Sequence, residues 1–241
     1  MHSQKIKAVV LKKTAYGDDD WIVTVLTEEG RRQSYFAPHA RKSQKRFGNT
    51  LDLFNYLELT SNQKSPDSLP RLESAVLVSS VPSICENMAK FAVACYLSEI
   101  ILEFLQAEQQ IPALFTFFIK SLNMMDEVDA LPHHFVPSAE HCLLDLFGFK
   151  PQLSACLHCS EAITPAGEYF FDGAKGSIVC LNCSPSVRAN PLSYDAIQAI
   201  LFQTKVEHED SLQIRRAFEH FIQYTAGKPL KSLQFLSRVL S

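Results

Sequence analysis

The residues of this sequence best spaced for chemistry are two cysteine pairs, Cys156-Leu157-His158-Cys159 and Cys180-Leu181-Asn182-Cys183, with 20 residues between them. Each pair presents two thiolates on one tight turn, and two such turns facing each other complete a tetrahedral site with four sulfur ligands. Four thiolates leave no coordination position for water. The spacing therefore predicts one structural, non-catalytic Zn²⁺ per chain, held by Cys156, Cys159, Cys180 and Cys183.

Two other interpretations of these cysteines compete with a zinc site. A redox CxxC is normally single and attached to a βαβ unit, which this sequence lacks. Four unrelated cysteines remain the second alternative. The other three of the seven cysteines, Cys85, Cys95 and Cys142, lie on apolar stretches and are expected to be buried and unreactive. The odd count argues against a disulfide framework and for a reducing cytoplasm.

A second candidate site is a basic run from Arg31 to Leu51 that contains no Asp or Glu. It lies in the basic part of an acidic chain: residues 1–80 hold 12 Lys and Arg against 9 Asp and Glu, whereas residues 81–241 hold 11 against 17. Cations on a small β-domain can follow nucleic-acid phosphates while aromatic residues stack on bases. The alternative is a solvated loop, with Phe47 and one of Tyr35 and Phe36 in the core.

Signatures of catalysis are missing from the sequence. It contains no GxxxxGK[ST], GxGxxG, HExxH or GxSxG motif, and no HxE accompanies the cysteine pairs. Asp18-Asp19-Asp20 can bind a cation, although such a run is more often a solvated turn between strands. We therefore expect a protein that is not an enzyme.

The elements that must position these residues change character near Pro82. Before it, apolar alternation and β-branched residues predict five strands, and the turn Glu28-Glu29-Gly30 joins the second strand to the third. The predicted strands lie around Ile6–Val10, Trp21–Thr27, Arg31–Ala37, Leu51–Thr60 and Leu72–Val78. Five short strands in this length predict a small barrel or sandwich.

After Pro82 the apolar residues follow a helical period. The predicted helices are Glu86–Gln106, Gln110–Met125, His134–Phe147, Asp195–Thr204, Asp210–Thr225 and Leu230–Leu240. The cysteine segment interrupts them as an insertion. No apolar run reaches the roughly 18 residues of a membrane span, and no secretion signal is visible. The expected class is α+β and multidomain, with domains at residues 1–80, 81–150, 151–187 and 188–241.

Several stretches, in this order, resemble the RecO family of bacterial DNA repair and recombination proteins. They are Tyr16-Gly17-Asp18-Asp19-Asp20, Thr27-Glu28-Glu29-Gly30, Ala40-Arg41-Lys42-Ser43, Arg46-Phe47-Gly48, Leu51–Leu59 and Leu230–Leu236. The similarity covers nearly the whole chain. It departs at His39, where the family often has Gly.

The resemblance implies an N-terminal OB-fold barrel, a helical domain with a four-cysteine zinc insert, and a non-enzymatic recombination mediator. It implies binding of single- and double-stranded DNA, annealing of complementary strands, and loading of RecA onto DNA coated with single-stranded DNA-binding protein (SSB). The implied partners are RecR and the C-terminal tail of SSB, in the bacterial cytoplasm and nucleoid. On this basis we predict phosphate contacts from Arg31, Arg32, Arg41, Lys42, Lys45 and Arg46.

Two functions from other classes compete with this prediction. One is a zinc-ribbon adaptor that binds only protein, with the basic run incidental. The other is a metal-dependent nuclease using Asp18 to Asp20, although these acids lie on one turn with no partner cluster in view.

Overall fold

The computed structural model describes residues 3–63, 65, 68–184, 190–202, 204 and 207–239, except for the side chains of Ser3, Gln44 and Lys45. Contacts divide the chain into two compact units, residues 1–129 and residues 130–239, which we describe separately. The first unit contains an all-β barrel and the second is mainly helical, so the predicted α+β class is confirmed. The four predicted domain boundaries stay a prediction.

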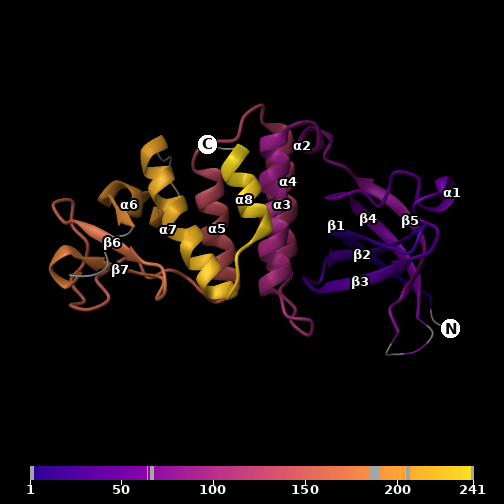
Figure 1. Ribbon diagram of the computed structural model, residues 1–241, viewed down its shortest axis with the longest axis horizontal. Helices are drawn as coiled ribbons and strands as arrows, with labels where there is room; N and C mark the ends of the chain where they lie inside the picture. Colours follow the sequence, from indigo (N-terminus) through magenta and orange to yellow (C-terminus); the bar gives the residue numbers. More distant parts are fainter. Residues whose placement is uncertain are drawn as a thin grey trace. The chain divides into compact units, whose positions relative to one another are not determined.

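Five strands form the barrel in the first unit (Figure 1). They are β1 (Ser3–Tyr16), β2 (Asp20–Thr27), β3 (Arg32–Ala37), β4 (Tyr56–Asn62) and β5 (Arg71–Ser79). The order around the barrel is β1-β2-β3-β5-β4, and the sheet is closed, as expected for an OB-like barrel. The predicted hairpin is confirmed, because β2 and β3 pair antiparallel across the turn at Gly30.

Alternation along the strands fills the barrel interior. The apolar side chains that point inward include Val10, Val23, Val25, Tyr35, Leu57, Leu59 and Leu72, all fully buried. The long strand β1 serves both sides of the barrel, since its first half pairs with β4 and its second half with β2. A register shift between Val10 and Lys12 separates the two halves, and a bulge of this kind bends a strand around a barrel. The barrel closes where β3 meets β5, and these two strands share one parallel pair, Phe36 with Arg71.

The prediction of a strand over the whole of Leu51–Thr60 is wrong in its first half. Strand β4 begins only at Tyr56, because Phe54 adopts a left-handed backbone with φ of 68°. The buried side chain of Asn55 donates hydrogen bonds to the backbone oxygens of Asn49 and Thr50. These local bonds stabilise a turn in a segment whose apolar pattern resembles a strand.

The barrel is followed in the first unit by the helices α2 (Pro82–Glu86), α3 (Met88–Phe104) and α4 (Pro112–Glu127). The predicted helix Glu86–Gln106 is split at Asn87, whose side chain accepts hydrogen bonds from the first backbone N–H groups of α3. The helices pack on the barrel through aromatic side chains. Phe54 lies against Phe91 of α3 with ring centroids 5.7 Å apart, and Tyr56 lies 5.6 Å from Phe115 of α4.

Helices α5 (Phe135–Leu146), α6 (Tyr194–Phe202), α7 (His208–Ala226) and α8 (Lys231–Val239) form most of the second unit. All four overlap the helices predicted from the sequence. Their buried residues include Leu143, Ile197, Ile214 and Phe218, which make an apolar core. None of the helices in the described residues combines the length and apolarity that a membrane crossing requires.

The cysteine segment folds as a small antiparallel sheet within the second unit. Its strands are β6 (Tyr169–Asp172), β7 (Ser177–Cys180) and the short β8 (Pro191–Leu192), in the order β7-β6-β8. Phe171 of β6 packs on α7, with ring centroids 5.8 Å from Phe218 and 6.0 Å from Phe221. At Gly176 a Cβ atom would lie 2.4 Å from the Phe221 ring, so this close approach requires glycine.

Candidate metal centre and nucleic-acid interface

The first cysteine pair lies on a closed turn. The backbone N–H of Cys156 donates to the oxygen of Glu161 at 2.9 Å, and Ser160 donates back to the oxygen of Cys156 at 2.9 Å. Ser160 has a φ of 60°, which reverses the chain within four residues of Cys156. The turn therefore directs the sulfurs of Cys156 and Cys159 to the same side.

The second cysteine pair lies where β7 ends. Cys180 is the last residue of β7, and a short 3₁₀ turn, η1 (Leu181–Cys183), carries the chain on to Cys183. The β6–β7 hairpin is set by Asp172, whose side chain accepts hydrogen bonds from the N–H groups of Ala174 and Lys175. The hairpin brings Cys180 against the first turn, and its backbone N–H donates to the sulfur of Cys156 at 3.4 Å.

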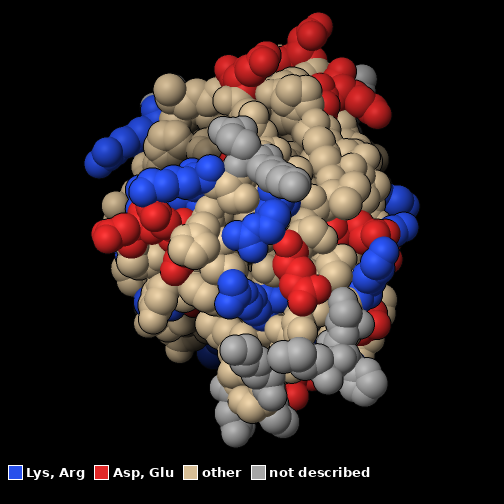
Figure 2. Space-filling view, turned by 90° about the vertical axis from the view of Figure 1, so that its right-hand side faces the viewer, with Lys and Arg blue, Asp and Glu red and all other residues tan. Residues whose placement is uncertain are grey.

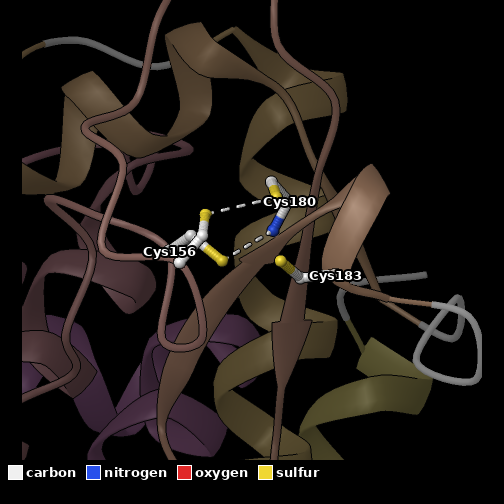
Figure 3. Close-up of side chains that lie close together, drawn as sticks. Cys156, Cys180 and Cys183 are labelled. Carbon is white, nitrogen blue, oxygen red and sulfur yellow. Dashed lines mark hydrogen bonds between the residues drawn. The ribbon is translucent and has the colours of Figure 1, made fainter.

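The four sulfur atoms converge on one point, as Figure 3 shows for Cys156, Cys180 and Cys183. All four lie within 4.8 Å of one another, and the sulfurs of Cys159 and Cys180 are 3.8 Å apart. Sulfurs bound at about 2.3 Å to a tetrahedral ion are separated by about 3.8 Å, so the cluster fits such an ion. Among the described residues, this is the only group of three or more His, Cys, Asp or Glu side chains close enough to hold a metal.

The electrostatics of the cluster favour a bound cation. Burial alone would raise the pKa of Cys156, but backbone N–H groups of Cys159, Cys180 and His158 donate to its sulfur and lower its pKa to about 6. The pKa of Cys183 is raised to about 12. The largest cause is the neighbouring sulfur of Cys180, and burial and the sulfurs of Cys159 and Cys156 add smaller contributions. Four thiolates this close repel one another unless a positive ion lies between them.

The other three cysteines differ partly from expectation. Cys95 and Cys142 are half-buried, but Cys85 is exposed, so the prediction that all three are buried is wrong. Cys85 opens to solvent because it lies in the short helix α2, of which only Ile84 is buried. The pKa of Cys95 is raised to about 11, mainly by burial and to a smaller extent by Cys85 and Glu99. Burial also raises the pKa values of Cys85 and Cys142. A raised pKa keeps the thiol protonated and unreactive.

The basic loop between β3 and β4 folds back onto the acidic turn between β1 and β2. Lys42 forms an ion pair with Asp19 at 2.7 Å, and Arg41 donates to the backbone oxygen of Asp18 at 2.9 Å. The carboxylate of Asp20 accepts a hydrogen bond from the backbone of His39 at 2.7 Å. These acids therefore hold the loop. Two of the three carboxylates already have partners within the protein, which disfavours a nuclease metal site here.

His39 has a φ of 55°, in the left-handed region that glycine adopts without strain. This explains physically why glycine suits the position where the sequence departs from the family pattern.

A short helix that was not predicted, α1 (Gln44–Phe47), follows the turn and is capped by Ser43. Arg46 in this helix donates to the backbone oxygen of Pro38 at 2.9 Å, and its guanidinium lies 5.1 Å from the Phe47 ring centroid. Lys45 lies outside the described side chains.

Arg31 and Arg32, at the start of β3, contact the end of α3 and the connection from α3 to α4 rather than the basic loop. Arg31 donates to the side chain of Gln110 at 2.8 Å and is paired with Glu29 at 3.5 Å. Arg32 donates to the backbone oxygen of Leu102, one of the last carbonyls of α3, where a cation is favourable. The structure thus distributes the predicted cations between two places on the first unit.

The charged surface is mixed. Figure 2 shows Lys and Arg side chains separated by Asp and Glu side chains on the face that it presents.

The aromatic side chains agree with the expectation that Phe47 and one of Tyr35 and Phe36 lie in the core. Tyr35 and Phe47 are buried in the barrel, while Phe36 is half-buried and points outward. Tyr16, at the end of β1, is 56% exposed and lies edge-on to Phe36, with ring centroids 5.9 Å apart.

A groove of about 500 Å³ opens beside Phe36, lined also by Arg46 and Arg71. Neither Arg71 nor Tyr16 is among the phosphate-contacting residues predicted from the sequence. Arg71 directly precedes the predicted fifth strand, whereas Tyr16 lies between the first and second predicted strands, next to Gly17. Nothing in the local sequence links Arg71 to Phe36, because their contact depends on the closure of the barrel.

Comparison with known protein families gives two matches. Residues 1–81 match the model described as Recombination protein O N terminal, and residues 85–234 match the model described as Recombination protein O C terminal. Together they cover nearly the whole chain.

Individual relatives are similar over almost their full length. A protein named DNA repair protein RecO from Syntrophus aciditrophicus (strain SB) is 29% identical over 250 residues, covering 98% of this chain and 96% of that protein. A protein of the same name from Desulfatibacillum aliphaticivorans is 31% identical over 245 residues, covering 95% and 94%. A third, from Bacillus pumilus (strain SAFR-032), is 28% identical over 249 residues, covering 98% and 94%.

Proposed function

The chain belongs to the RecO family of DNA repair proteins, and from this premise we propose that it is a non-enzymatic, DNA-binding mediator of recombinational repair. One observation carries the DNA-binding part of the proposal. The closed barrel bears outward aromatic side chains next to cations, with Phe36 and Arg46 on one groove. Cations that follow the phosphates and rings that stack on bases are the combination with which small barrels bind nucleic acid.

The phosphate contacts are proposed for the six cations predicted from the sequence: Arg31, Arg32, Arg41, Lys42, Lys45 and Arg46. Arg31, Arg41 and Lys42 have exposed side chains, so they can reach a phosphate without rearrangement of the core. Arg32 also stabilises the end of α3, so its replacement affects folding as well as binding.

In the proposed activity the protein binds single- and double-stranded DNA and anneals complementary strands. A cationic surface that displaces counterions from both strands lowers the repulsion between them. Together with RecR, and by contact with the C-terminal tail of SSB, it would help to load RecA onto SSB-coated DNA. This activity takes place in the bacterial cytoplasm, where the chromosome lies.

The metal is proposed to be a structural Zn²⁺, one per chain. Zinc prefers four thiolates in tetrahedral geometry, and a site with four sulfur ligands has no position for a reacting water. The metal would hold together the two turns of a segment that has few apolar side chains of its own. Metal analysis of protein purified without added metal should find close to one zinc per chain; four freely titratable thiols with no metal would contradict this assignment.

The DNA-binding proposal is tested by fluorescence anisotropy of a labelled single-stranded oligonucleotide at several salt concentrations. We expect affinity to fall steeply as salt rises, with a slope of roughly −0.7 per phosphate neutralised on a single strand. Unlabelled duplex competes if the same surface binds both forms. Absence of binding at low salt would contradict the proposal.

A protein adaptor without DNA binding is the second candidate, and one observation favours it. The two cysteine turns expose equivalent apolar side chains, Leu157 at 40% and Leu181 at 41%, which can pack against a partner. The salt titration separates the two candidates, because an adaptor of this kind shows no salt-dependent affinity for the oligonucleotide.

A further inference from the structure

A groove of about 500 Å³ opens in the cysteine segment, between the loop of residues 161–168 and the second cysteine turn. Apolar and acidic side chains share its lining, which includes Ala162, Ala166, Tyr169, Leu181, Glu161 and Glu168. All of these residues belong to the second unit, so the groove is formed within that unit.

Hydrogen bonds hold the wall of the groove in place. The hydroxyl of Tyr169 accepts a hydrogen bond from the backbone N–H of Thr164 at 2.6 Å and donates one to the oxygen of Thr164 at 3.3 Å. The backbone oxygen of Glu168 accepts a hydrogen bond from Leu181 at 3.0 Å, which joins the loop to the second cysteine turn. The groove is therefore formed before a partner arrives, and this lowers the entropic cost of binding.

Leu181 gives the groove an apolar contact that the protein leaves partly uncovered. It is 41% exposed, although it lies directly after the metal-ligand candidate Cys180. A partner's aliphatic side chain can cover such a surface and remove it from water. Leu157 has the equivalent position in the first cysteine turn and is 40% exposed, but it lies outside the groove.

The charge of the groove is negative. Glu161 and Glu168 are both exposed, and within the described part of the chain neither carboxylate forms an ion pair with Lys or Arg. Glu161 lies 3.7 Å from the sulfur of Cys159, which as a metal-bound thiolate would add negative charge. Lys175, the only Lys or Arg of residues 151–184, lies in the hairpin turn at the far end of β6 and β7 from Cys180.

A positively charged protein segment matches these features. Phosphates and acidic peptides are repelled by the two carboxylates, whereas Lys and Arg side chains are attracted to them. A single divalent ion is a poorer match, because among the described residues Glu161 and Glu168 do not belong to a group of three metal-ligand side chains. An aliphatic side chain next to the cation would cover Leu181.

We propose that this groove docks a basic segment of a partner protein, whose Lys or Arg side chains contact Glu161 and Glu168 while a neighbouring aliphatic side chain packs on Leu181. The inference goes beyond the proposed DNA binding. It uses the proposed metal to hold the second cysteine turn in place. The barrel and the cysteine segment would thus bind partners of opposite charge.

The test is fluorescence anisotropy of the full-length, metal-loaded protein with a labelled short peptide in which one leucine is flanked by arginines. The combined variant Glu161→Gln/Glu168→Gln keeps the shape of both side chains and should weaken peptide binding roughly fivefold at low salt, because two exposed charge pairs are lost. Leu181→Ser should weaken binding by a similar factor, about fivefold, because the leucine of the peptide loses its apolar contact. High salt should reduce the effect of the Gln variant by screening the charge pairs.

Matched variants separate the groove from general attraction to an acidic chain. Glu207 and Glu209 are exposed acids of the same unit, so Glu207→Gln/Glu209→Gln removes the same charge and should leave the affinity unchanged. Leu157→Ser is the control for Leu181→Ser and should also leave it unchanged. A peptide with serine in place of leucine should bind more weakly, and one with glutamate in place of arginine should not bind.

Three results would overturn the proposal: no binding of the arginine peptide, equal losses in the two Gln variants, or equal binding of the glutamate peptide. Metal content and urea midpoint are measured for every variant. Glu161→Gln/Glu168→Gln replaces no metal ligand, so it decides the test if Leu181→Ser loses the metal. The titration contains no nucleic acid, so its failure leaves the proposed DNA binding standing, and failure of DNA binding leaves this groove standing.

Discussion

Replacement of Gly30 by alanine should destabilise the first unit well beyond the strain of the turn alone. Gly30 lies in the β2–β3 turn with a φ of 75°, and its backbone oxygen accepts a hydrogen bond from Ile111 at the start of α4. A Cβ at this position would lie 1.9 Å from the backbone oxygen of Ile111. A backbone atom cannot move aside as a flexible side chain can, so the turn and the helix must separate.

The magnitude follows from two separate costs. A left-handed backbone costs an alanine about 1–2 kcal/mol relative to glycine. Loss of the hydrogen bond from Ile111 adds about 1 kcal/mol. Gly30→Ala should therefore lower the free energy of unfolding by about 2–3 kcal/mol, and loss of packing next to Ile111 adds to this. Gly17→Ala is the matched control: Gly17 has a φ of 57° and no atom within 4 Å of its added Cβ, so only the backbone cost of about 1–2 kcal/mol applies.

The assay is urea unfolding followed by tryptophan fluorescence. The chain has one tryptophan, Trp21, which packs against the barrel core and so reports on the first unit. The difference between the two variants isolates the contact of the turn with α4. Equal midpoints would refute the reasoning, because they would mean that the barrel unfolds independently of the helices that follow residue 80.

Three further predictions concern other parts of the chain. A chelator that removes the metal should destabilise the second unit, seen as a lower midpoint by circular dichroism, and leave oligothymidine affinity within about twofold, since the proposed DNA contacts lie on the barrel. The pKa of His141 is lowered in the folded protein, mainly by burial and then by Lys150. Below about pH 6.5 the unfolded chain therefore binds a proton at this residue more readily than the folded protein does, and the free energy of unfolding declines as the pH falls. In His141→Leu the free energy of unfolding should fall less between about pH 7 and 5 than in the unmodified protein. The control His39→Asn, at an exposed histidine, should keep the full decline. An identical pH profile in both variants contradicts the assignment. Asp19→Asn removes the partner of Lys42 and should tighten oligothymidine binding several-fold, whereas Asp195→Asn on α6 should not; looser binding would remove the basic loop from the DNA interface.

The features of this structure that follow from short sequence spacing or from regular alternation are predicted well from the sequence. The two CxxC pairs restrict each pair of sulfurs to one turn, so only the approach of the two turns had to be inferred. Alternation along β3 predicts that one of Tyr35 and Phe36 lies in the core, and the structure shows that Tyr35 is the buried one.

Interactions over a long sequence separation could not be predicted in the same way. Leu51 to Asn55 alternates like a strand, but a hydrogen-bonded turn around Asn55 competes with the sheet and prevails. The basic run has no acids within it, yet Asp19 neutralises Lys42 from a turn more than 20 residues earlier. The groove depends on Phe36 and Arg71, which meet only because β3 and β5 close the barrel.

The charge of the cysteine segment supports placing the proposed metal and the proposed DNA contacts on different parts of the molecule. Described residues 151–184 contain the acids Glu161, Glu168 and Asp172 and one cation, Lys175. A divalent ion bound by four thiolates adds negative charge to this surface, because the thiolates outnumber the charges of the ion. Phosphates are repelled by such a surface, whereas cations on the barrel attract them. We therefore expect the proposed metal to act on the fold of the second unit, and the proposed DNA contacts to lie on the first.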